Sequence, residues 1–371
     1  MKDIVVIGSG KIGATIARLL ADTGDYHVTV VDRSAQQLAE IESGPARSTA
    51  KLDVTDDAVL AAQLSGKLAV LSAAPFQLTV AIATAAARAG IHYLDLTEDV
   101  ESTRQVKRIA KAAKTAFIPQ CGLAPGFISI VASDLSHKFD SLDSVRLRVG
   151  ALPQFPSNAL NYNLTWSTDG VINEYIQPCE AIVNGELVEV PALEEREEFS
   201  LDGVTYEAFN TSGGLGTFCE TLKGKVNTLN YRTIRYPGHA AIMKALLHDL
   251  GLRHRRDVLK DMLERALPTT LQDVVIIFVT VSGRRGGRLV QETYAKKIYS
   301  AEVGGRITSA IQITTASSIC AVLDLLVGDK ISAQGFIRQE DIGLNAFLEN
   351  RFGVCYRQGD AAKHHGATVA A

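Results

Sequence analysis

The first twenty residues combine an apolar strand-like segment, a glycine-rich turn and a helix-like segment, and this combination limits the possible folds more than any other feature. The segment "KDIVVIGSGKIGATIARLL" places Gly8, Gly10 and Gly13 between β-branched residues and apolar residues at helical spacing. In this context G-x-G-x-x-G permits a tight turn, a close backbone approach to a pyrophosphate and close helix–strand packing. The pyrophosphate would lie at the helix N-terminus, beside Lys11 and Ile12, where free N–H groups attract an anion.

A second strand-like segment, "YHVTVVD", ends at Asp32, about twenty residues beyond Gly13. An acid at this position binds the adenosine ribose hydroxyls, so the turn and the acid together favour a dinucleotide site over a merely structural glycine turn. The carboxylate of Asp32 repels a 2′-phosphate, whereas the following Arg33 can receive one. The sequence therefore favours NAD, with NADP as the alternative.

Strand-like and helix-like segments then alternate, as in "KLAVLSAAPF", "IHYLDLTED" and "TAFIPQCG". This alternation predicts an α/β domain with a doubly wound parallel sheet of the Rossmann type. Ligands of such sheets bind at the carboxyl ends of the strands, and an ordinary strand-end loop is the alternative for each residue there. The candidate cofactor-binding residues at these ends are Asp53, Val54, Ala73, Ala74, Pro75, Leu94, Asp95, Cys121 and Gly122.

From about residue 123 the segments become β-rich, with hairpin signals at Asn184-Gly185 and Asp202-Gly203 and two long strands around "SGRRGGR". We expect an α+β domain with a large, mostly antiparallel sheet. The predicted organisation is an NAD-binding domain over residues 1–122, a substrate-binding and dimerisation domain over 123–334, and a C-terminal helix near 335–360 that returns to the first domain. Residues 361–371 are predicted to be a disordered tail.

The overall composition excludes several classes of partner. The 38 Lys and Arg residues nearly balance the 41 Asp and Glu residues, which predicts no nucleic-acid or acidic-membrane surface. The five cysteines are scattered without zinc-ligand spacing, which predicts reduced thiols, a cytoplasmic location and no metal site. No signal peptide and no apolar run suited to spanning a bilayer is expected, so we interpret the protein as soluble.

A hydride-transferring enzyme also needs a group that exchanges a proton with its substrate. Asp95 in "YLDLTED" is a candidate base or ammonium ligand, and a helix-capping carboxylate is an equally good alternative. Glu98 and Asp99 fit the capping role better. Cys121 in "QCGLAPGF" is a candidate nucleophile, although a small residue beside the nicotinamide explains it better.

The segment "YRTIRYPGHAAIMKAL" gathers polar side chains around a turn before a helix. Arg235 offers a fork for a carboxylate, Tyr236 adds a hydroxyl, and His239 is a candidate proton shuttle. A packed strand-to-helix turn with an exposed arginine is the alternative. Trp166 and Glu174, in "LTWSTDGVINEY", belong to a segment that can line the same cleft, and Glu174 is a further candidate base.

Six segments in this order resemble the saccharopine dehydrogenase-like family: "VVIGSGKIG", "YLDLTED", "CGLAPGF", "WSTDGVINEY", "TSGGLGTF" and "YRTIRYPGH". The similarity covers nearly the whole chain apart from the tail, and it is greatest to the lysine 6-dehydrogenases. The segments "CGLAPG" and "RYPGH" are specific to the superfamily, whereas the glycine fingerprint is not. One departure is "RITSAIQITTA", where the family often has Thr-Ala-Met.

The resemblance implies NAD-dependent oxidation of L-lysine at its ε-carbon, which yields ammonia and a semialdehyde that cyclises to a piperideine carboxylate. It also implies a homodimer or homotetramer built through the sheet domain. By motif matching it assigns Cys121, Gly122 and Pro125 to the nicotinamide side and Arg235 and His239 to the substrate side.

Other functions stay open. Saccharopine, or a carboxyalkyl polyamine of the carboxynorspermidine type, carries a further carboxylate-bearing arm and needs a further cation in the cleft. We expect that Arg146 and Arg148 do not both face the cleft, which favours the smaller substrate. A non-enzymatic NAD-sensing protein is the third possibility, and it predicts nucleotide binding without turnover.

Overall fold

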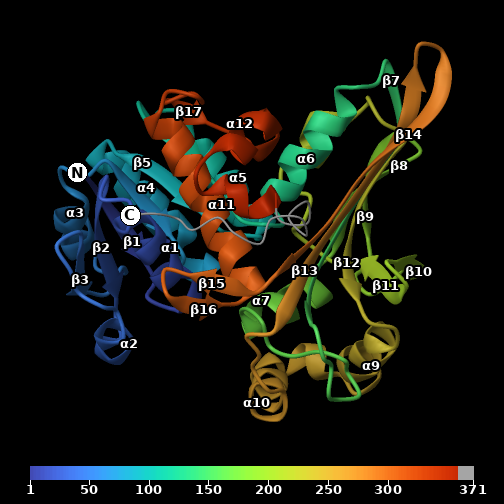
Figure 1. Cartoon of the computed structure of the whole chain (residues 1–371), viewed down its shortest axis with the longest axis horizontal. Coiled ribbons are helices and arrows are strands. Elements are labelled where there is room, and N and C mark those ends of the chain that lie inside the picture. The colour runs from blue at the N-terminus through green and yellow to red at the C-terminus, as the bar shows by residue number, and fades with distance from the viewer. Residues whose placement is uncertain (358–371) are drawn as a thin grey trace.

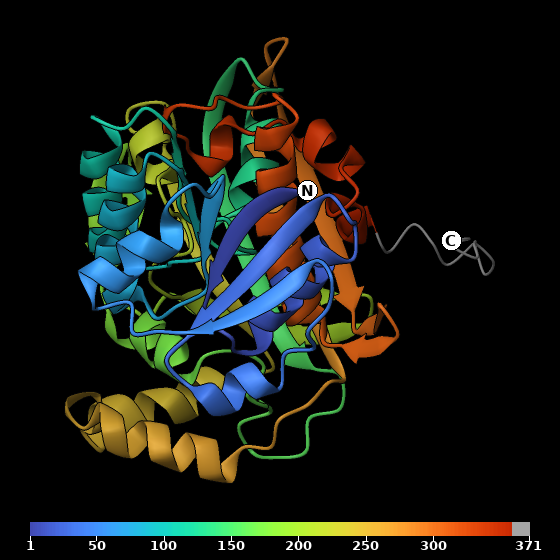
Figure 2. The same ribbon diagram turned by 90° about the vertical axis from the view of Figure 1, so that its left-hand side faces the viewer.

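The computed structural model describes residues 1–357. Within this range, seven strands form a parallel sheet in the order β17-β6-β5-β4-β1-β2-β3 (Figure 2). The strands are β1 (Lys2–Ile7), β2 (Tyr26–Asp32), β3 (Arg47–Lys51), β4 (Ala69–Ser72), β5 (His92–Asp95), β6 (Ala116–Ile118) and β17 (Gly335–Phe336). This arrangement confirms the predicted doubly wound sheet.

Both faces of this sheet are covered by helices, because its central strands carry apolar residues on both sides. Ile4 and Val6 of β1 belong to the apolar core on the face covered by α1, whereas Val5 and Ile7 belong to a second core on the opposite face. The helices of this domain are α1 (Lys11–Ala21), α2 (Ala35–Ala39), α3 (Asp57–Leu64), α4 (Thr79–Ala89) and α5 (Val100–Ala110). The continuous apolar runs of the sequence thus match strands buried on both faces.

The second domain contains a sheet in the order β10-β11-β12-β7-β13-β14, with β8 paired to β12 and β9. It is antiparallel except where β12 pairs with β7, so the sheet is mixed. Its strands are β7 (Ser141–Pro153), β8 (Cys179–Val183), β9 (Glu186–Val190), β10 (Glu197–Leu201), β11 (Val204–Asn210), β12 (Thr228–Arg235), β13 (Asp273–Arg285) and β14 (Arg288–Tyr299). A small hairpin follows, made of β15 (Ala301–Val303) and β16 (Arg306–Thr308).

The helices of the second half lie between the sheets or at the ends of the second sheet (Figure 1). They are α6 (Phe127–Ser136), α7 (Thr168–Ile176), α8 (Phe218–Leu222), α9 (His239–Lys244), α10 (Arg256–Ala266), α11 (Ala310–Val327) and α12 (Leu344–Glu349). Both α6 and α11 contact β13, and α11 also packs against α1 of the first domain. One apolar core therefore contains residues of both domains.

Helix α11 corrects one expectation from the sequence. Its 18 residues have a mean hydropathy of 1.7, which is long and apolar enough for a membrane span by length and composition alone. However, 78% of the helix is buried inside the protein. A helix packed on several sides has no polar stripe, and burial against protein therefore accounts for this composition.

The C-terminal part of the described chain contacts both domains. Strand β17 pairs in parallel with β6, and α12 contacts both α6 and α11. The tail predicted for residues 361–371 lies outside the described residues.

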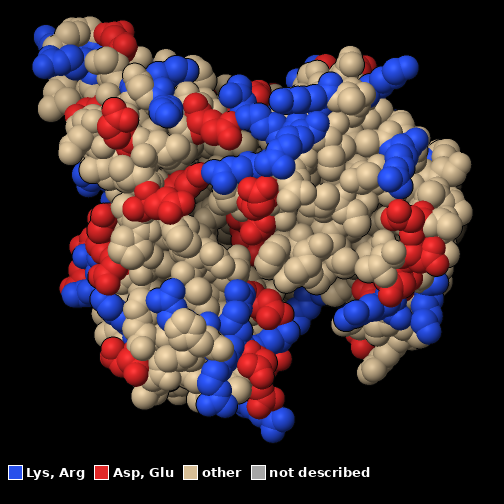
Figure 3. Space-filling model, turned by 180° about the vertical axis from the view of Figure 1, so that it is seen from behind, with Lys and Arg blue, Asp and Glu red and all other residues tan. Residues whose placement is uncertain are grey.

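On the face seen from behind, acidic and basic side chains are interspersed, and the surface is hollowed between the two domains (Figure 3).

Candidate active site at the junction of the domains

The glycine turn between β1 and α1 has the space and the donors that a pyrophosphate requires. A Cβ at Gly13 would lie 1.8 Å from the carbonyl oxygen of Gly8, so helix and turn meet too closely for any side chain. A Cβ at Gly10 would meet nothing within 4 Å, which leaves open space above the helix. No side chain caps the N-terminus of α1, and its N–H groups are available to an anion. These features fit a bound dinucleotide.

Asp32 lies at the carboxyl end of β2, beside this turn. One carboxylate oxygen accepts hydrogen bonds from the backbone N–H and the hydroxyl of Ser9, and the other accepts one from the N–H of Ser34. Partial burial opposes ionisation, but these hydrogen bonds outweigh it and lower the pKa of Asp32. A carboxylate with a lowered pKa at this position favours ribose hydroxyls over a 2′-phosphate. Arg33 is exposed and is the nearby cation that the alternative cofactor requires.

The remaining predicted cofactor residues occupy different positions. Asp53 is exposed after β3 and accepts hydrogen bonds from the N–H and hydroxyl of Thr55, while Val54 is buried. Leu94 is buried within β5, so its side chain does not face the cavity described next. The predicted residues that line that cavity are Ile12, Ala73, Ala74, Pro75, Gly122 and Pro125. They form its dinucleotide side.

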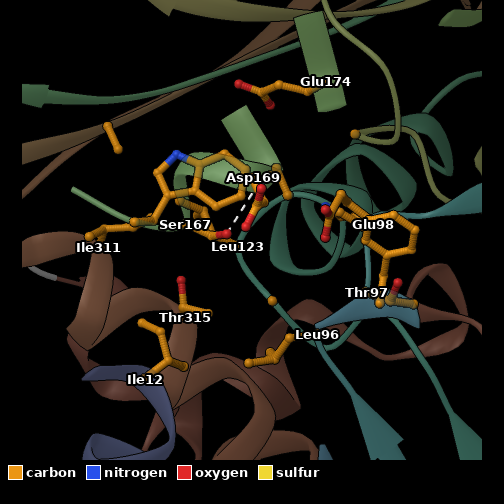
Figure 4. A pocket seen from close by; sticks show the side chains of 18 of the residues that line it. Ile12, Leu96, Thr97, Glu98, Leu123, Ser167, Asp169, Glu174, Ile311 and Thr315 are labelled. Atoms are coloured by element: carbon orange, nitrogen blue, oxygen red, sulfur yellow. Dashed lines mark hydrogen bonds between the residues drawn. The ribbon is translucent and has the colours of Figure 1, made fainter. Parts of the chain in front are cut away.

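A cavity of about 320 Å³ lies where this side meets the second domain (Figure 4). The second domain contributes Trp166 and charged side chains from α7, together with Tyr231 and Arg235 from β12. The ionisable groups on its wall are Glu98, Asp169, Glu174, Tyr231 and Arg235. In Figure 4, Glu98 points toward the middle of the cavity, and Glu174 lies on the side opposite Ile12 and Leu96.

Two glycines allow the aromatic rings of this wall to lie against the backbone. A Cβ at Gly170 would be 2.3 Å from the ring of Trp166, and a Cβ at Gly214 would be 2.3 Å from the ring of Tyr231. The motifs "WSTDG" and "TSGG" therefore have a packing reason for their glycines. Both segments shape the substrate side of the cavity.

Arg235 is held by a chain of hydrogen bonds that ends in the backbone. The Nδ1–H of His239 donates to the carbonyl of Leu160 at 2.9 Å, because a carbonyl can only accept. The other ring nitrogen, Nε2, therefore accepts from the hydroxyl of Tyr175 at 3.0 Å. The same hydroxyl oxygen accepts from Nε of Arg235 at 2.9 Å. This order of donors fixes both the histidine tautomer and the orientation of the guanidinium.

The rest of the guanidinium faces the carbonyl of Ile234 and the carboxyl of Glu174, at 2.9 and 3.4 Å. Three of its N–H groups are thus engaged within the protein, and the side chain also lines the cavity. Burial raises the pKa of Glu174 to about 8, against the opposing effect of Arg235 and with a contribution from Glu98. Below about pH 8 Glu174 is therefore largely neutral, and Arg235 gives the pair a net positive charge.

The geometry corrects the role expected of His239. Its ring is buried, does not line the cavity, and has both nitrogens engaged within the protein. Burial and the charge of Arg235 lower the pKa of His239 to about 3. A neutral histidine behind Tyr175 orients Arg235 and does not exchange a proton with a substrate.

Three other predicted site residues also lie outside the cavity wall. Asp95 is buried and accepts hydrogen bonds from Tyr93, Thr97 and Gln120 at 2.7 to 3.0 Å, and burial raises its pKa to about 6. The buried thiol of Cys121 donates to a backbone carbonyl, and burial raises its pKa well above the usual value, so it is no thiolate nucleophile. The hydroxyl of Tyr236 donates to the carbonyl of Pro153. All three have structural contacts instead of substrate contacts.

Several cavity residues were not predicted. Glu98 was interpreted as a possible helix cap, but Asp99 is the cap of α5, through the N–H of Ser102. Because ligands of parallel sheets bind at the carboxyl ends of the strands, the position of Glu98 a few residues after β5 already indicated a cavity residue. Ile311 and Thr315 reach the cavity from α11, and no local pattern in the sequence predicts that contact.

Glycine turns of this kind bind dinucleotides for hydride transfer, and the adjoining cavity offers groups suited to a carboxylate and an amine. The fold and the glycine turn together define the class of NAD(P)-binding proteins with a Rossmann-type domain. Two family models match the chain: the NADP-binding domain of saccharopine dehydrogenase over residues 4–118, and the C-terminal domain of saccharopine dehydrogenase over residues 122–350. The chain belongs to the saccharopine dehydrogenase family, and the family-level resemblance inferred from its motifs is confirmed.

Similar curated proteins carry the same family name. The chain is 23% identical over 278 residues to saccharopine dehydrogenase [NADP(+), L-glutamate-forming] of Pyricularia oryzae, an alignment that covers 72% of this chain and 61% of that protein. It is 29% identical over 181 residues to the Saccharomyces cerevisiae protein of the same name, covering 46% and 40% of the two chains. These alignments span less than two thirds of the relatives' length.

Two solved structures share the fold. Apo saccharopine dehydrogenase (L-Glu forming) from Saccharomyces cerevisiae superposes with a TM-score of 0.76 at 18% identity, covering 92% of this chain and 94% of that one. A homospermidine synthase from Legionella pneumophila in complex with NAD superposes with a TM-score of 0.67 at 12% identity, covering 96% and 89%. At such identities the likeness concerns the fold alone.

Proposed function

We propose that this protein oxidises a carbon–nitrogen bond of an amino acid with NAD(P), and that L-lysine is the first candidate substrate. The observation that carries the proposal is the charge of the cavity wall. Among the described lining residues, one cation, Arg235, is accompanied by three acids, Glu98, Asp169 and Glu174. A substrate with one carboxylate and a distant ammonium group matches this distribution.

Different residues of the cavity bind the two ends of such a substrate. Arg235 binds the carboxylate through its guanidinium, in the orientation set by Tyr175. Glu98, which forms no ion pair within residues 1–357, attracts the distant ammonium group. The small residues Ala73 and Ala74 leave room at the dinucleotide side, where the bound cofactor supplies the hydride acceptor.

The second candidate substrate is saccharopine, and the names of the relatives favour it over L-lysine. Saccharopine carries additional carboxylates, for which the described cavity wall offers no second arginine or lysine. Both candidates share one chemistry, in which an amine is oxidised to an imine that water then hydrolyses. They differ in the product that leaves with the nitrogen, which is ammonia from L-lysine and glutamate from saccharopine.

The test measures the near-ultraviolet absorbance of the reduced nicotinamide with NAD or NADP and with L-lysine or saccharopine. Reduction with L-lysine alone supports the first candidate, and reduction with saccharopine alone moves the function to the second. Arg235→Gln is expected to raise the KM of the active substrate, whereas Arg104→Gln, on the exposed surface of α5, leaves it unchanged. Binding of NAD without oxidation of either amino acid contradicts the proposal and favours a polyamine substrate or an NAD-sensing role.

The location and the assembly of the protein complete the proposal. All five cysteines lie in the described part of the chain and are free thiols, which fits a cytoplasmic location. We also propose a homodimer or homotetramer built through the second sheet. Size-exclusion chromatography with light scattering measures this directly, and a monomer contradicts it.

A further inference from the structure

Glu98 lies at the point where the dinucleotide side of the cavity meets the second domain. It follows β5 at the carboxyl end of the parallel sheet, next to Leu96 and Thr97, which line the cavity with it. From the other domain, Gly213 packs so closely that a Cβ there would lie 2.5 Å from the carbonyl oxygen of Glu98. Contacts from both domains therefore fix the backbone that carries this carboxyl.

The other acids near the cavity already have partners. Asp169 pairs with Lys260 at 2.5 Å, and its side chain is 56% exposed, which places it at the rim. Glu174 pairs with Arg235. Asp99 caps α5, and in residues 1–357 no lysine, arginine or histidine forms an ion pair with Glu98. Glu98 is thus the acid in the cavity that is available to a ligand.

The surroundings of Glu98 give it the protonation behaviour of a base that works near neutral pH. Burial raises its pKa to about 7, and the charges of Asp99 and Asp95 contribute. A general base is most effective when its pKa lies close to the working pH. The ionisable groups that interact with it are Asp95 and Asp99 from its own loop and Glu174 from α7. Asp169, Tyr231 and Arg235 line the same cavity.

We propose that Glu98 is the catalytic base that takes a proton from the substrate nitrogen. The inference rests on the proposed oxidation of a carbon–nitrogen bond and holds for either candidate substrate. An N–H bond of the ammonium group breaks and an O–H bond forms on Glu98, which leaves a lone pair on nitrogen. That pair forms the C=N bond as the adjacent carbon gives up its hydrogen with two electrons to NAD(P)⁺, the oxidant of the reaction.

The kinetic test compares Glu98→Gln with the parent protein across pH, using the amino acid that the absorbance assay identifies. The variant is expected to lower kcat by about 10²- to 10⁴-fold and to lose the fall in kcat/KM below about pH 7. Glu98→Asp keeps a carboxyl group and is expected to keep that fall at a reduced rate. The control is Glu101→Gln, which removes an exposed acid from α5 and leaves both parameters unchanged.

A second measurement does not depend on turnover. Calorimetric titration of L-lysine or saccharopine into the protein with bound NADH, in buffers of different ionisation enthalpy, counts the protons exchanged on binding. An ammonium group beside Glu98 favours its carboxylate, so the parent protein is expected to release a proton near pH 7 and Glu98→Gln is expected to release none. Measured thermal midpoints verify that the variants are folded.

The two proposals fail in different ways. If one amino acid is oxidised and Glu98→Gln keeps both its rate and its fall at low pH, the role of Glu98 is wrong and the proposed function stands. Equal proton release by the parent protein and Glu98→Gln overturns the role as well. If neither amino acid binds or is oxidised, the proposed function is wrong and the role falls with it.

Discussion

Replacement of Tyr175 by Phe tests whether buried hydrogen bonds behind the cavity determine substrate binding. The change removes one hydroxyl group and keeps the ring, which packs edge-on against Phe209 and His239. Nε of Arg235 loses its acceptor at 2.9 Å, and Nε2 of His239 loses its donor at 3.0 Å. Both partners stay buried, at 3% and 1% exposure. Water does not readily replace the lost partner, so the guanidinium is no longer held in one orientation.

The expected magnitude follows from the charge of the donor. A hydrogen bond to a charged group contributes about 1.5–3 kcal/mol, which corresponds to a change of about 10- to 150-fold in an equilibrium constant. Because the hydroxyl contacts Arg235 and not the reacting carbon, we expect this change in the KM of the substrate, with kcat changed much less. Steady-state kinetics with the active amino acid measures both parameters.

Tyr236→Phe is the matched control. Tyr236 directly follows β12, the strand that carries Arg235, but its hydroxyl donates to the carbonyl of Pro153 outside the cavity wall. We expect its KM to equal that of the parent protein within about twofold. A Tyr175→Phe variant that is folded and has an unchanged KM refutes the reasoning, as does an equal rise in KM for Tyr236→Phe.

Three further predictions concern the cofactor turn and the acids. Gly13→Ala places a Cβ 1.8 Å from a carbonyl oxygen and is expected to lower the stability of the protein by about 1–3 kcal/mol. Gly10→Ala has open space and is expected to keep the thermal midpoint while weakening NADH binding about tenfold or more. Equal thermal midpoints for the two variants contradict this prediction. Asp32→Ser is expected to shift the ratio of the NADP and NAD dissociation constants about tenfold or more toward NADP, measured by fluorescence titration, and an unchanged ratio refutes the role of the carboxylate. The raised pKa of Glu98 means that the folded protein binds this proton more tightly than the unfolded chain, so the stabilisation from this proton disappears as pH rises from 4.5 to about 7. Above that range, Glu98→Gln is expected to be more stable than the parent protein by at most about 3 kcal/mol in urea unfolding. A stability difference that stays constant across pH contradicts the shift.

The parts of this structure that could be predicted from the sequence depend on local patterns. The glycine turn, the strand before it and the helix after it lie within about twenty residues, and each glycine has a steric reason. The acid at Asp32 follows from the same unit. The alternation of segments then determines the parallel sheet, because crossover connections of one hand leave few other arrangements.

The substrate side was harder to predict because its contacts join distant segments. Of the turn "RYPGH", Arg235 lines the cavity, whereas the hydroxyl of Tyr236 donates to the carbonyl of Pro153 outside the cavity wall. The role of His239 depends on Tyr175, which lies 64 residues earlier in the chain. No local pattern predicts that pairing. The burial of α11 between two sheets also depends on tertiary packing, and composition alone gave no indication of it.

The position of α11 between the sheets has a consequence for how the two domains move. Ile4 of β1, Ile319 of α11 and Val275 of β13 belong to one apolar core, so the domains share an interior instead of meeting at a wet boundary. A wide hinge opening would expose that interior to water at every catalytic cycle. We therefore expect substrates to enter past loops at the cavity mouth, while the groups that the two domains contribute to the reaction keep a constant separation.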